Sequence, residues 1–202
     1  MKLAIFRLMR IPFRMSAFLI ASASVFFATS ESQAYCTQGK TYEIKKGKHS
    51  SGTHLGYFKG KSLKVSFRLD DGAIYQSQSP ENQWDVNKLF GFTDCNALDP
   101  QQNSARFGWR WNPGTSKIEI LAFVDHNGNH SFQDLGTTSP GEVSEGTIAL
   151  EDGKYAFYYK GKRVVMARNC SKNKMQGFKL YPYFGGQETA PHDIHIWLKR
   201  MN

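Results

Sequence analysis

The chain has 202 residues, enough for one domain with a short appendage, and 40% of them are hydrophobic and 14% aromatic. This apolar content supplies a core and excludes an intrinsically disordered chain, while the 18 glycines and many aromatics are unlike a coiled coil or long helical bundle. The 26 basic residues outnumber the 17 acidic ones, which gives a net charge of +9.

Residues 1–34 have the pattern of a secretory signal peptide. Four basic residues precede an apolar run over residues 15–28, and the small-residue pattern Ser32-Gln33-Ala34 follows. We therefore expect an exported protein, periplasmic or extracellular, with no membrane span after processing. An uncleaved membrane anchor is the alternative.

The basic excess persists after removal of this segment. Processing leaves 22 basic and 16 acidic residues, a net charge of +6. Such a charge serves either solubility or attraction to an acidic partner, such as an anionic polysaccharide or another envelope component. Nucleic acid is not expected as a partner, because an exported protein seldom meets it and no nucleic-acid-binding motif is present.

Three cysteines, Cys36, Cys95 and Cys170, favour one disulfide with one thiol left over in an oxidising compartment. We predict that Cys95 pairs with Cys170, because Cys36 lies near the new N-terminus, where chains are usually loose. Zinc is not expected, because the sequence has no CxxC or CxxH pair.

The segment after the signal peptide begins with a Lys-, Gly- and Ser-rich stretch. Residues 35–60 predict a short strand and a flexible loop, and residues 61–202 predict the β-sandwich domain. From residue 63 to residue 69 apolar and polar side chains alternate, which is the period of a half-buried strand. Asp71-Gly72 predicts a tight turn into a returning strand over residues 73–78, and residues 82–89 have a weak helical pattern.

The alternation recurs to the C-terminus, and Asn127-Gly128 is its strongest hairpin signal. The further predicted strands are 104–112, 117–126, 129–135, 147–150, 154–159, 163–168, 178–183 and 193–199. Short strands, Gly-rich turns and the lack of a long helical pattern predict an all-β fold, an antiparallel β-sandwich of jelly-roll type.

Arg106 and Arg110 are candidate ligand-binding residues. Alternation over residues 105–111 places Phe107 and two tryptophans on one side and both arginines on the other. We assign the tryptophans to the core rather than to a sugar platform, because large aromatics in register with an apolar stripe are usually buried. Gly108, between the arginines, is expected to leave room for a ligand near the backbone.

The last strand and the loop before it carry the other candidates. Three aliphatic side chains form its predicted buried set, which leaves Asp193, His195, Trp197 and Lys199 on the open side. These side chains suit a saccharide-binding surface if their strand lies near that of Arg106; a solvated face with cross-strand ion pairs is the alternative.

The loop from residue 181 to residue 192 is restricted by two glycines and a proline. It holds Tyr183, Gln187, Glu188 and His192, which form either a ligand site or a structural corner.

The segments NSARFGWRW at 103–111, YPYFGG at 181–186 and APHDI at 190–194 together resemble a group of small exported bacterial proteins and lipoproteins, mostly uncharacterised. The resemblance spans about residues 88–199. It implies export and a jelly-roll sandwich, and it brings no activity with it. Tyr35 precedes Cys36 where a lipoprotein needs a small residue, so lipidation is not expected.

The sequence contains no complete catalytic motif. Residues 125–134 have alternating oxygen ligands, but the position of the glycine and the lack of a closing Glu fit a hairpin better than a calcium loop. No carboxylate pair stands out for glycoside hydrolysis. A polysaccharide lyase needs a cation and a base, parts that Arg106, Arg110, His195 and Tyr181 are able to fill, although the familiar lyase strand motifs are missing.

The leading hypothesis is a non-catalytic exported β-sandwich that binds an anionic glycan without a cofactor or metal. Its predicted ligand-binding residues are Arg106, Arg110, Tyr183, Gln187, Glu188, His192, Asp193, His195 and Trp197. The alternatives are a lyase acting on an acidic polysaccharide and a structural or adhesive envelope component.

Overall fold

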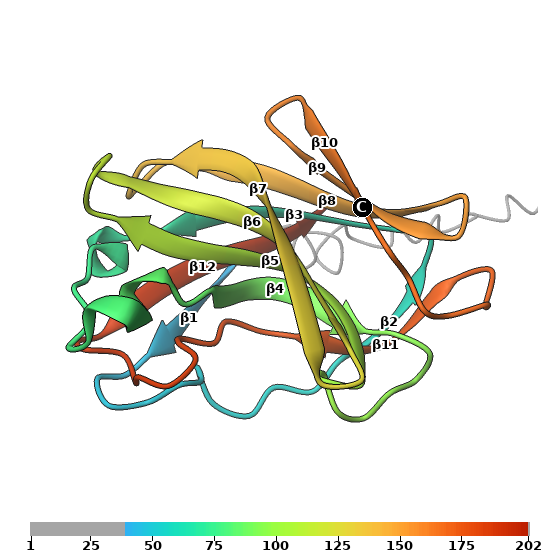
Figure 1. The fold of residues 1–202 in the computed structure, drawn as a ribbon, viewed down its shortest axis with the longest axis horizontal. Coiled ribbons are helices and arrows are strands. Elements are labelled where there is room, and N and C mark those ends of the chain that lie inside the picture. Colours follow the sequence, from blue (N-terminus) through green and yellow to red (C-terminus); the bar gives the residue numbers. More distant parts are fainter. Residues whose placement is uncertain (1–38, 202) are drawn as a thin grey trace, which may run out of the picture.

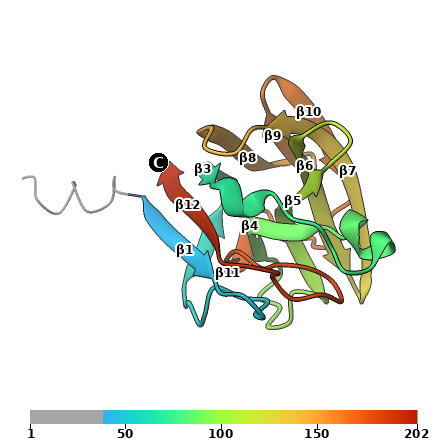
Figure 2. The ribbon, with the colours of Figure 1, turned by 90° about the vertical axis from the view of Figure 1, so that its left-hand side faces the viewer.

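The structure, a computed structural model, describes residues 39–201, which form two six-stranded antiparallel sheets packed face to face (Figures 1 and 2). In order across the first sheet lie β1 (Lys40–Ile44), β12 (Ile194–Met201), β3 (Ser62–Leu69), β8 (Ser144–Glu151), β9 (Lys154–Tyr159) and β10 (Lys162–Met166). In order across the second lie β2 (Tyr57–Gly60), β11 (Met175–Leu180), β4 (Asn87–Thr93), β5 (Asn103–Asn112), β6 (Lys117–His126) and β7 (Asn129–Thr138). The predicted all-β sandwich is confirmed. The predicted signal peptide and Cys36 lie outside the described residues.

The core lies between the sheets and is rich in aromatic rings. Phe107 and Trp109 of β5 are fully buried, and Trp111 is nearly so, as the alternation predicts. The Phe107 ring stacks on Phe90 of β4 at 4.9 Å and meets Phe157 of β9 edge-on at 5.5 Å. Contacts of this kind stabilise beyond the area that they bury, so β5 joins the two layers.

The predicted returning strand over residues 73–78 is wrong. The Asp70 carboxylate accepts a hydrogen bond from the Gly72 N–H at 3.1 Å and caps a short 3-10 helix, η1 (Asp71–Ala73). The chain then runs on without strand structure to residue 79. The Gln83 side chain satisfies backbone groups of this segment that a neighbouring strand would otherwise pair with. It accepts a hydrogen bond from the Ser77 N–H at 2.8 Å and donates one to the Tyr75 carbonyl.

The weak helical pattern at residues 82–89 corresponds to two elements. A 3-10 helix, η2 (Pro80–Trp84), overlaps the first residues of the pattern, and β4 starts three residues after it ends. Proline at the first position of η2 suits a helix start, since its missing N–H would have no partner there. Sequence periodicity missed β4, whose residues are buried on both faces except at Lys88.

One disulfide joins Cys95 to Cys170, as predicted, with their Cα atoms 5.9 Å apart and a sequence separation of 75. It ties the turn after β4 to the loop that precedes β11. A disulfide indicates an oxidising, extracytoplasmic compartment. Among residues 39–201 no helix is long and apolar enough to cross a membrane.

A buried ion pair lies beside the disulfide. Asp94 is fully buried and accepts hydrogen bonds from Arg168 Nε at 2.6 Å, from the Tyr155 hydroxyl at 2.7 Å and from the Gln176 N–H at 3.0 Å. Burial alone raises the pKa of Asp94, but Arg168 and the other donors outweigh it and hold the pKa below its usual range. The Arg168 guanidinium also donates to three loop carbonyls, so the loop depends on this pair.

Arg168→Met leaves the Asp94 carboxylate buried without its cation. We expect a loss of about 3–5 kcal/mol in the free energy of unfolding, measured by urea denaturation with the disulfide intact. The double substitution Asp94→Asn with Arg168→Met should recover part of this loss, because no isolated charge remains. A single variant as stable as the unmodified protein would contradict the assigned role.

Candidate functional site

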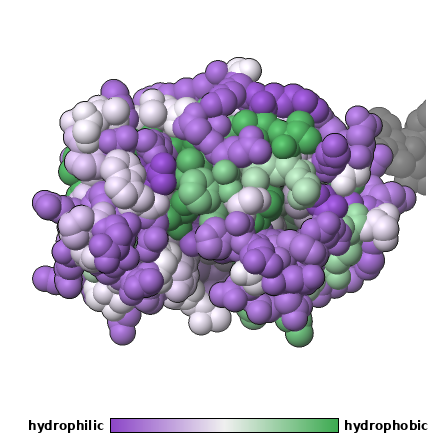
Figure 3. Space-filling view, in the orientation of Figure 1, coloured by the Kyte–Doolittle hydropathy of each residue, from purple (hydrophilic) through white to green (hydrophobic). Residues whose placement is uncertain are grey.

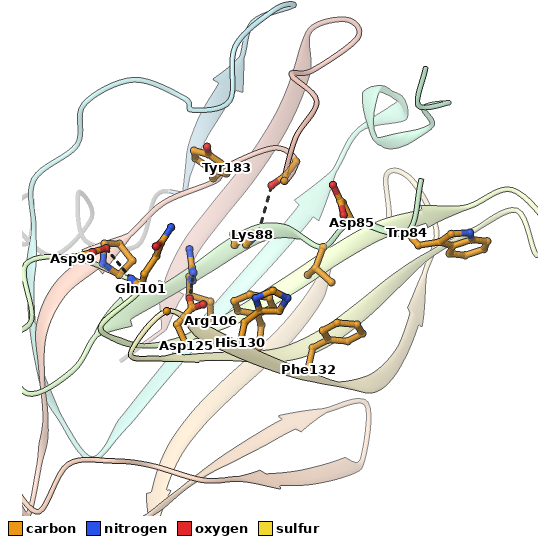
Figure 4. Close-up of a pocket in the computed structure, with 16 residues that line it drawn as sticks. Trp84, Asp85, Lys88, Asp99, Gln101, Arg106, Asp125, His130, Phe132 and Tyr183 are labelled. Carbon is orange, nitrogen blue, oxygen red and sulfur yellow. Dashed lines mark hydrogen bonds and ion pairs between the residues drawn. The ribbon is translucent and has the colours of Figure 1, made fainter. Parts of the chain in front are cut away.

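A cavity of about 480 Å³ lies on the outer face of the second sheet, away from the core. This face is turned toward the viewer in Figure 1, and Figure 3 shows an apolar hollow at its centre bordered by hydrophilic side chains. Strands β4 to β7 form the floor. The walls come from the chain after η2, the turn before β5 and the loop after β11 (Figure 4).

The floor is apolar. Val86, Leu121 and Phe123 form a buried cluster separate from the main core. The expectation that Gly108 leaves room for a ligand is wrong, because Val86 occupies that space: a Cβ on Gly108 would lie 2.4 Å from Val86 Cγ1. Glycine at this position allows the apolar floor to pack against β5.

Two cationic side chains lie over the Phe123 ring. The Arg106 guanidinium carbon is 5.1 Å from the ring centre and the Lys88 Nζ is 4.9 Å from it. His130 stacks on the same ring at 5.6 Å. Cations over an aromatic face are attracted by its quadrupole, and more strongly where water is excluded.

Arg106 lies on the predicted outer face, but its side chain is only 12% exposed and is ion-paired with Asp125. The Asp125 carboxylate also accepts from the Ser104 hydroxyl at 3.1 Å. No atom of residues 39–201 accepts a hydrogen bond from the buried Arg106 Nε. Unsatisfied buried donors are rare in folded proteins and require a specific explanation.

Lys88 is held at the centre of the cavity by a pair of backbone hydrogen bonds. Its N–H donates to the Tyr183 carbonyl at 2.8 Å, and the Tyr183 N–H donates back at 2.9 Å. Burial, reinforced by the charge of Arg106, lowers the pKa of Lys88 to about 8. Near neutral pH a fraction of this amine is therefore uncharged and able to accept a proton.

Tyr183 reaches the cavity from the loop after β11, with its ring stacked on His49 at 5.3 Å. The loop needs its first glycine, because Gly185 has φ +82° and a Cβ there would lie 2.1 Å from the Glu188 carbonyl oxygen. The predicted shaped loop is confirmed, and it places a phenol beside Lys88.

Carboxylates lie toward the two ends of the cavity, with the cations between them (Figure 4). Asp99 accepts from the Gln101 N–H at 2.9 Å at one end. Asp85 lies between Lys88 and Trp84 toward the other end. The arrangement therefore offers cations at the centre and hydrogen-bond acceptors on both sides.

Two of the predicted ligand residues support the walls. The Glu188 carboxylate accepts from the Gln78 and Ser79 N–H groups, both at 2.8 Å, and from the Asn82 side chain at 2.7 Å. It thereby fixes η2 to the loop after β11. The Gln187 N–H lies 3.4 Å from an Asp85 oxygen.

Arg110 lies beside the cavity, four residues along β5 from Arg106. Its Nε bonds Glu119 at 2.6 Å, so neither predicted arginine projects freely into solvent.

The remaining predicted residues lie elsewhere. His195 and Trp197 belong to β12 in the first sheet, whereas Arg106 belongs to β5 in the second, so the predicted single surface is wrong. Alternation correctly places these side chains on outer faces, but the sandwich turns the two outer faces in opposite directions. His192 and Asp193 immediately precede β12, where they bond the Gly72 carbonyl at 2.9 Å and the Lys46 N–H at 2.8 Å.

Two further expectations are corrected by packing. Trp197 is half-buried against Gly39, where a Cβ would lie 2.1 Å from the indole. Tyr181, a candidate lyase base, packs against Tyr42 and His54 and lines a different cavity from Arg106.

Sequence reasoning missed most of the cavity. Lys88 lies in the segment with the weak helical pattern, and Asp125 and His130 lie in the segment whose pattern fits a hairpin. The exposed aromatics Trp84 and Phe132 also line it. A usable signal existed in β6, where Phe123 and Asp125 fall on the same side as each other and opposite to the core residue Val124.

The fold resembles that of alginate lyase AlyC3, with a TM-score of 0.54 and 14% identity over 81% of this chain and 74% of that one. AlyC3 in complex with dimannuronate matches with a TM-score of 0.50, 14% identity and coverage of 81% and 73%. The carbohydrate-binding module CBM66 from Bacillus subtilis aligns more weakly, with a TM-score of 0.38, 10% identity and coverage of 82% and 92%. At these identities the likeness concerns the fold alone. No protein-family model and no curated protein matches the sequence.

The His195 imidazole, on the outer face of the first sheet, lies between two carboxylates, and its titration is expected to affect the stability of the fold. Its Nδ1 lies 2.8 Å from Asp70 and its Nε2 lies 3.2 Å from Glu43, and the bond to Asp70 in particular raises the pKa of His195. Protonation therefore stabilises the fold below about pH 6.5, the unfolded value, and the contribution is lost as pH rises through the folded-state pKa.

We expect the thermal midpoint of the unmodified protein to fall more between about pH 6 and pH 8 than that of His195→Gln. Differential scanning calorimetry across this range measures the difference. His130→Gln, which removes an imidazole from the other sheet, is the control. Parallel pH profiles for His195→Gln and the unmodified protein would refute the assignment.

Proposed function

We propose that the protein binds an acidic polysaccharide in this cavity and cleaves it by β-elimination. The observation that carries the proposal is the placement of Lys88, an amine with a lowered pKa, beside Arg106 and Tyr183 in one cavity. Binding alone needs cations and hydrogen-bond donors. Elimination also needs a base, and the lowered pKa of Lys88 leaves a fraction of its amine uncharged near neutral pH, a fraction that grows as the pH rises toward 8.

Each group has a defined part in the proposed reaction. Arg106 donates hydrogen bonds to the carboxylate of a uronate unit and stabilises the negative charge that develops there, which makes the proton on the adjacent carbon easier to remove. The uncharged Lys88 amine takes that proton from C5, and the electron pair forms a C4–C5 double bond. The bond between C4 and the glycosidic oxygen breaks, and the Tyr183 hydroxyl donates its proton to the departing oxygen.

The substrate class follows from charge and fold together. A uronate polymer carries the carboxylates that Arg106 and the net positive charge attract. The fold likeness supports the same class, since AlyC3 is an alginate lyase of which one structure holds dimannuronate. Alginate is therefore the first polymer to test, with polygalacturonate and hyaluronate beside it.

Non-catalytic glycan binding is the second candidate. It is favoured by the pairing of Arg106 with Asp125 and by the carboxylates at both ends, which suit sugar hydroxyls. The two candidates differ in one observable, the appearance of an unsaturated product.

Lys88→Gln tests the proposed base. Incubation of the unmodified protein with each polymer should raise the ultraviolet absorbance of the unsaturated product, and the rate should increase with pH through about 8, as Lys88 loses its proton. Lys88→Gln should lower the rate by about 100-fold or more while the protein still binds the polymer on an affinity gel.

Lys154→Gln, which removes an exposed lysine from β9, is the matched control and should leave the rate unchanged. Retention on the gel with flat absorbance for all three polymers would favour the non-catalytic candidate. Absence of both retention and product, even at low salt, would remove both candidates.

A further inference from the structure

A stack of aromatic and cationic side chains lies at one end of the cavity. The Arg110 guanidinium carbon is 5.3 Å from the centre of the Trp84 ring and 5.8 Å from that of Phe132. Both aromatic residues line the cavity, yet Trp84 is 48% exposed and Phe132 is 43% exposed. Two large aromatics left this open beside one cavity need an explanation that the chemistry at Lys88 does not provide.

The stack is fixed before any ligand arrives. Arg110 donates to the Trp84 carbonyl at 3.0 Å and to Glu119 at 2.6 Å, which holds the guanidinium near both rings. The Glu188 carboxylate anchors η2, the helix that ends in Trp84, by accepting one hydrogen bond from Asn82 in the helix and two from backbone N–H groups just before it. A rigid aromatic loses little conformational entropy on binding, so a ring held in this way is a ready contact surface.

The distance from the proposed reaction centre exceeds one sugar unit. Arg110 follows Arg106 by four residues along β5, which a strand spans in about 13 Å. One cavity is lined both by Arg106 and by the Trp84 and Phe132 rings that Arg110 contacts, and Asp85 lies between Lys88 and Trp84 (Figure 4). A polysaccharide with one uronate at Arg106 therefore has further units at the aromatic end.

We propose that Trp84 and Phe132 form a saccharide subsite that binds a pyranose ring of the same chain, beyond the unit held at Arg106. The apolar C–H face of the sugar packs on the exposed aromatic surface, and its hydroxyl groups bond Asp85 and the Arg110 guanidinium. The inference rests on the proposed function, and it makes chain length a determinant of affinity.

The test compares short and long ligands in a protein that leaves them intact. Disaccharides and hexasaccharides of mannuronate, guluronate and galacturonate are titrated by calorimetry into Lys88→Gln and into Lys88→Gln with Trp84→Ala. We expect the hexasaccharide to bind the first protein more tightly than the disaccharide. Trp84→Ala should weaken hexasaccharide binding about tenfold and leave disaccharide binding unchanged.

Two further variants show that the effect belongs to the ring. Trp84→Phe keeps an aromatic face and should restore part of the affinity, and Phe132→Ala should repeat the loss. Tyr57→Ala is the control, because Tyr57 is an equally exposed aromatic, at 50%, on β2 outside this cavity.

The outcomes separate the subsite from the proposed function. Equal hexasaccharide affinity with and without the Trp84 ring overturns the subsite while the proposed function stands. Equal losses for both ligand lengths also overturn it, since the ring would then act on the whole site. If no saccharide binds the unmodified protein or Lys88→Gln, the proposed function and the subsite fall together.

Discussion

Because successive side chains of a strand point to opposite faces, β5 contributes both to the core and to the cavity on the outer face. Phe107 and Trp109 enter the core, where Phe107 contacts aromatic rings of both sheets, and the alternate side chains Arg106 and Arg110 face outward. The direction of Arg106 is therefore fixed by the burial of its neighbours, because turning the arginine inward would turn the core residues out. Packing of the core residues of β5 therefore also fixes the position of Arg106 in the cavity.

On that outer face, the apolar floor determines how the charges behave. Phe123 and its neighbours exclude water below Arg106 and Lys88, and charges in such a setting interact more strongly than they do in solvent. Asp125 offsets the charge of Arg106, while Lys88 responds by releasing its proton more readily. The two neighbouring cations therefore differ. Arg106 stays charged, whereas the pKa of Lys88 is lowered to about 8.

Local sequence signals predicted the strands well and their positions relative to one another poorly. Alternation identified the buried sides of β3, β5 and β12, and Asn127-Gly128 marked its hairpin, because these features depend on residues close together in the chain. Which sheet a strand joins depends on long-range pairing, and the pattern around His195 carries no information about β5. The predicted surface failed for this reason although each of its two faces was assigned correctly.

The parts of the site that escaped prediction are those defined by tertiary contacts. Lys88 reaches the cavity through a backbone pair with Tyr183, nearly a hundred residues away in sequence. Glu188 looked like a ligand residue, but its three donors come from the turn around η2, and only the folded chain brings them together. Side-chain type indicated a functional region in the loop after β11, but it did not distinguish residues that line the cavity from those that brace it.

The bond between Cys95 and Cys170 has a consequence for where the site becomes complete. Cys95 lies at the start of the turn that carries Asp99 and Gln101, which form one end of the cavity. In a reducing compartment this turn would lack its covalent link to the loop before β11. Formation of this end of the cavity is therefore tied to the oxidising compartment that the disulfide indicates.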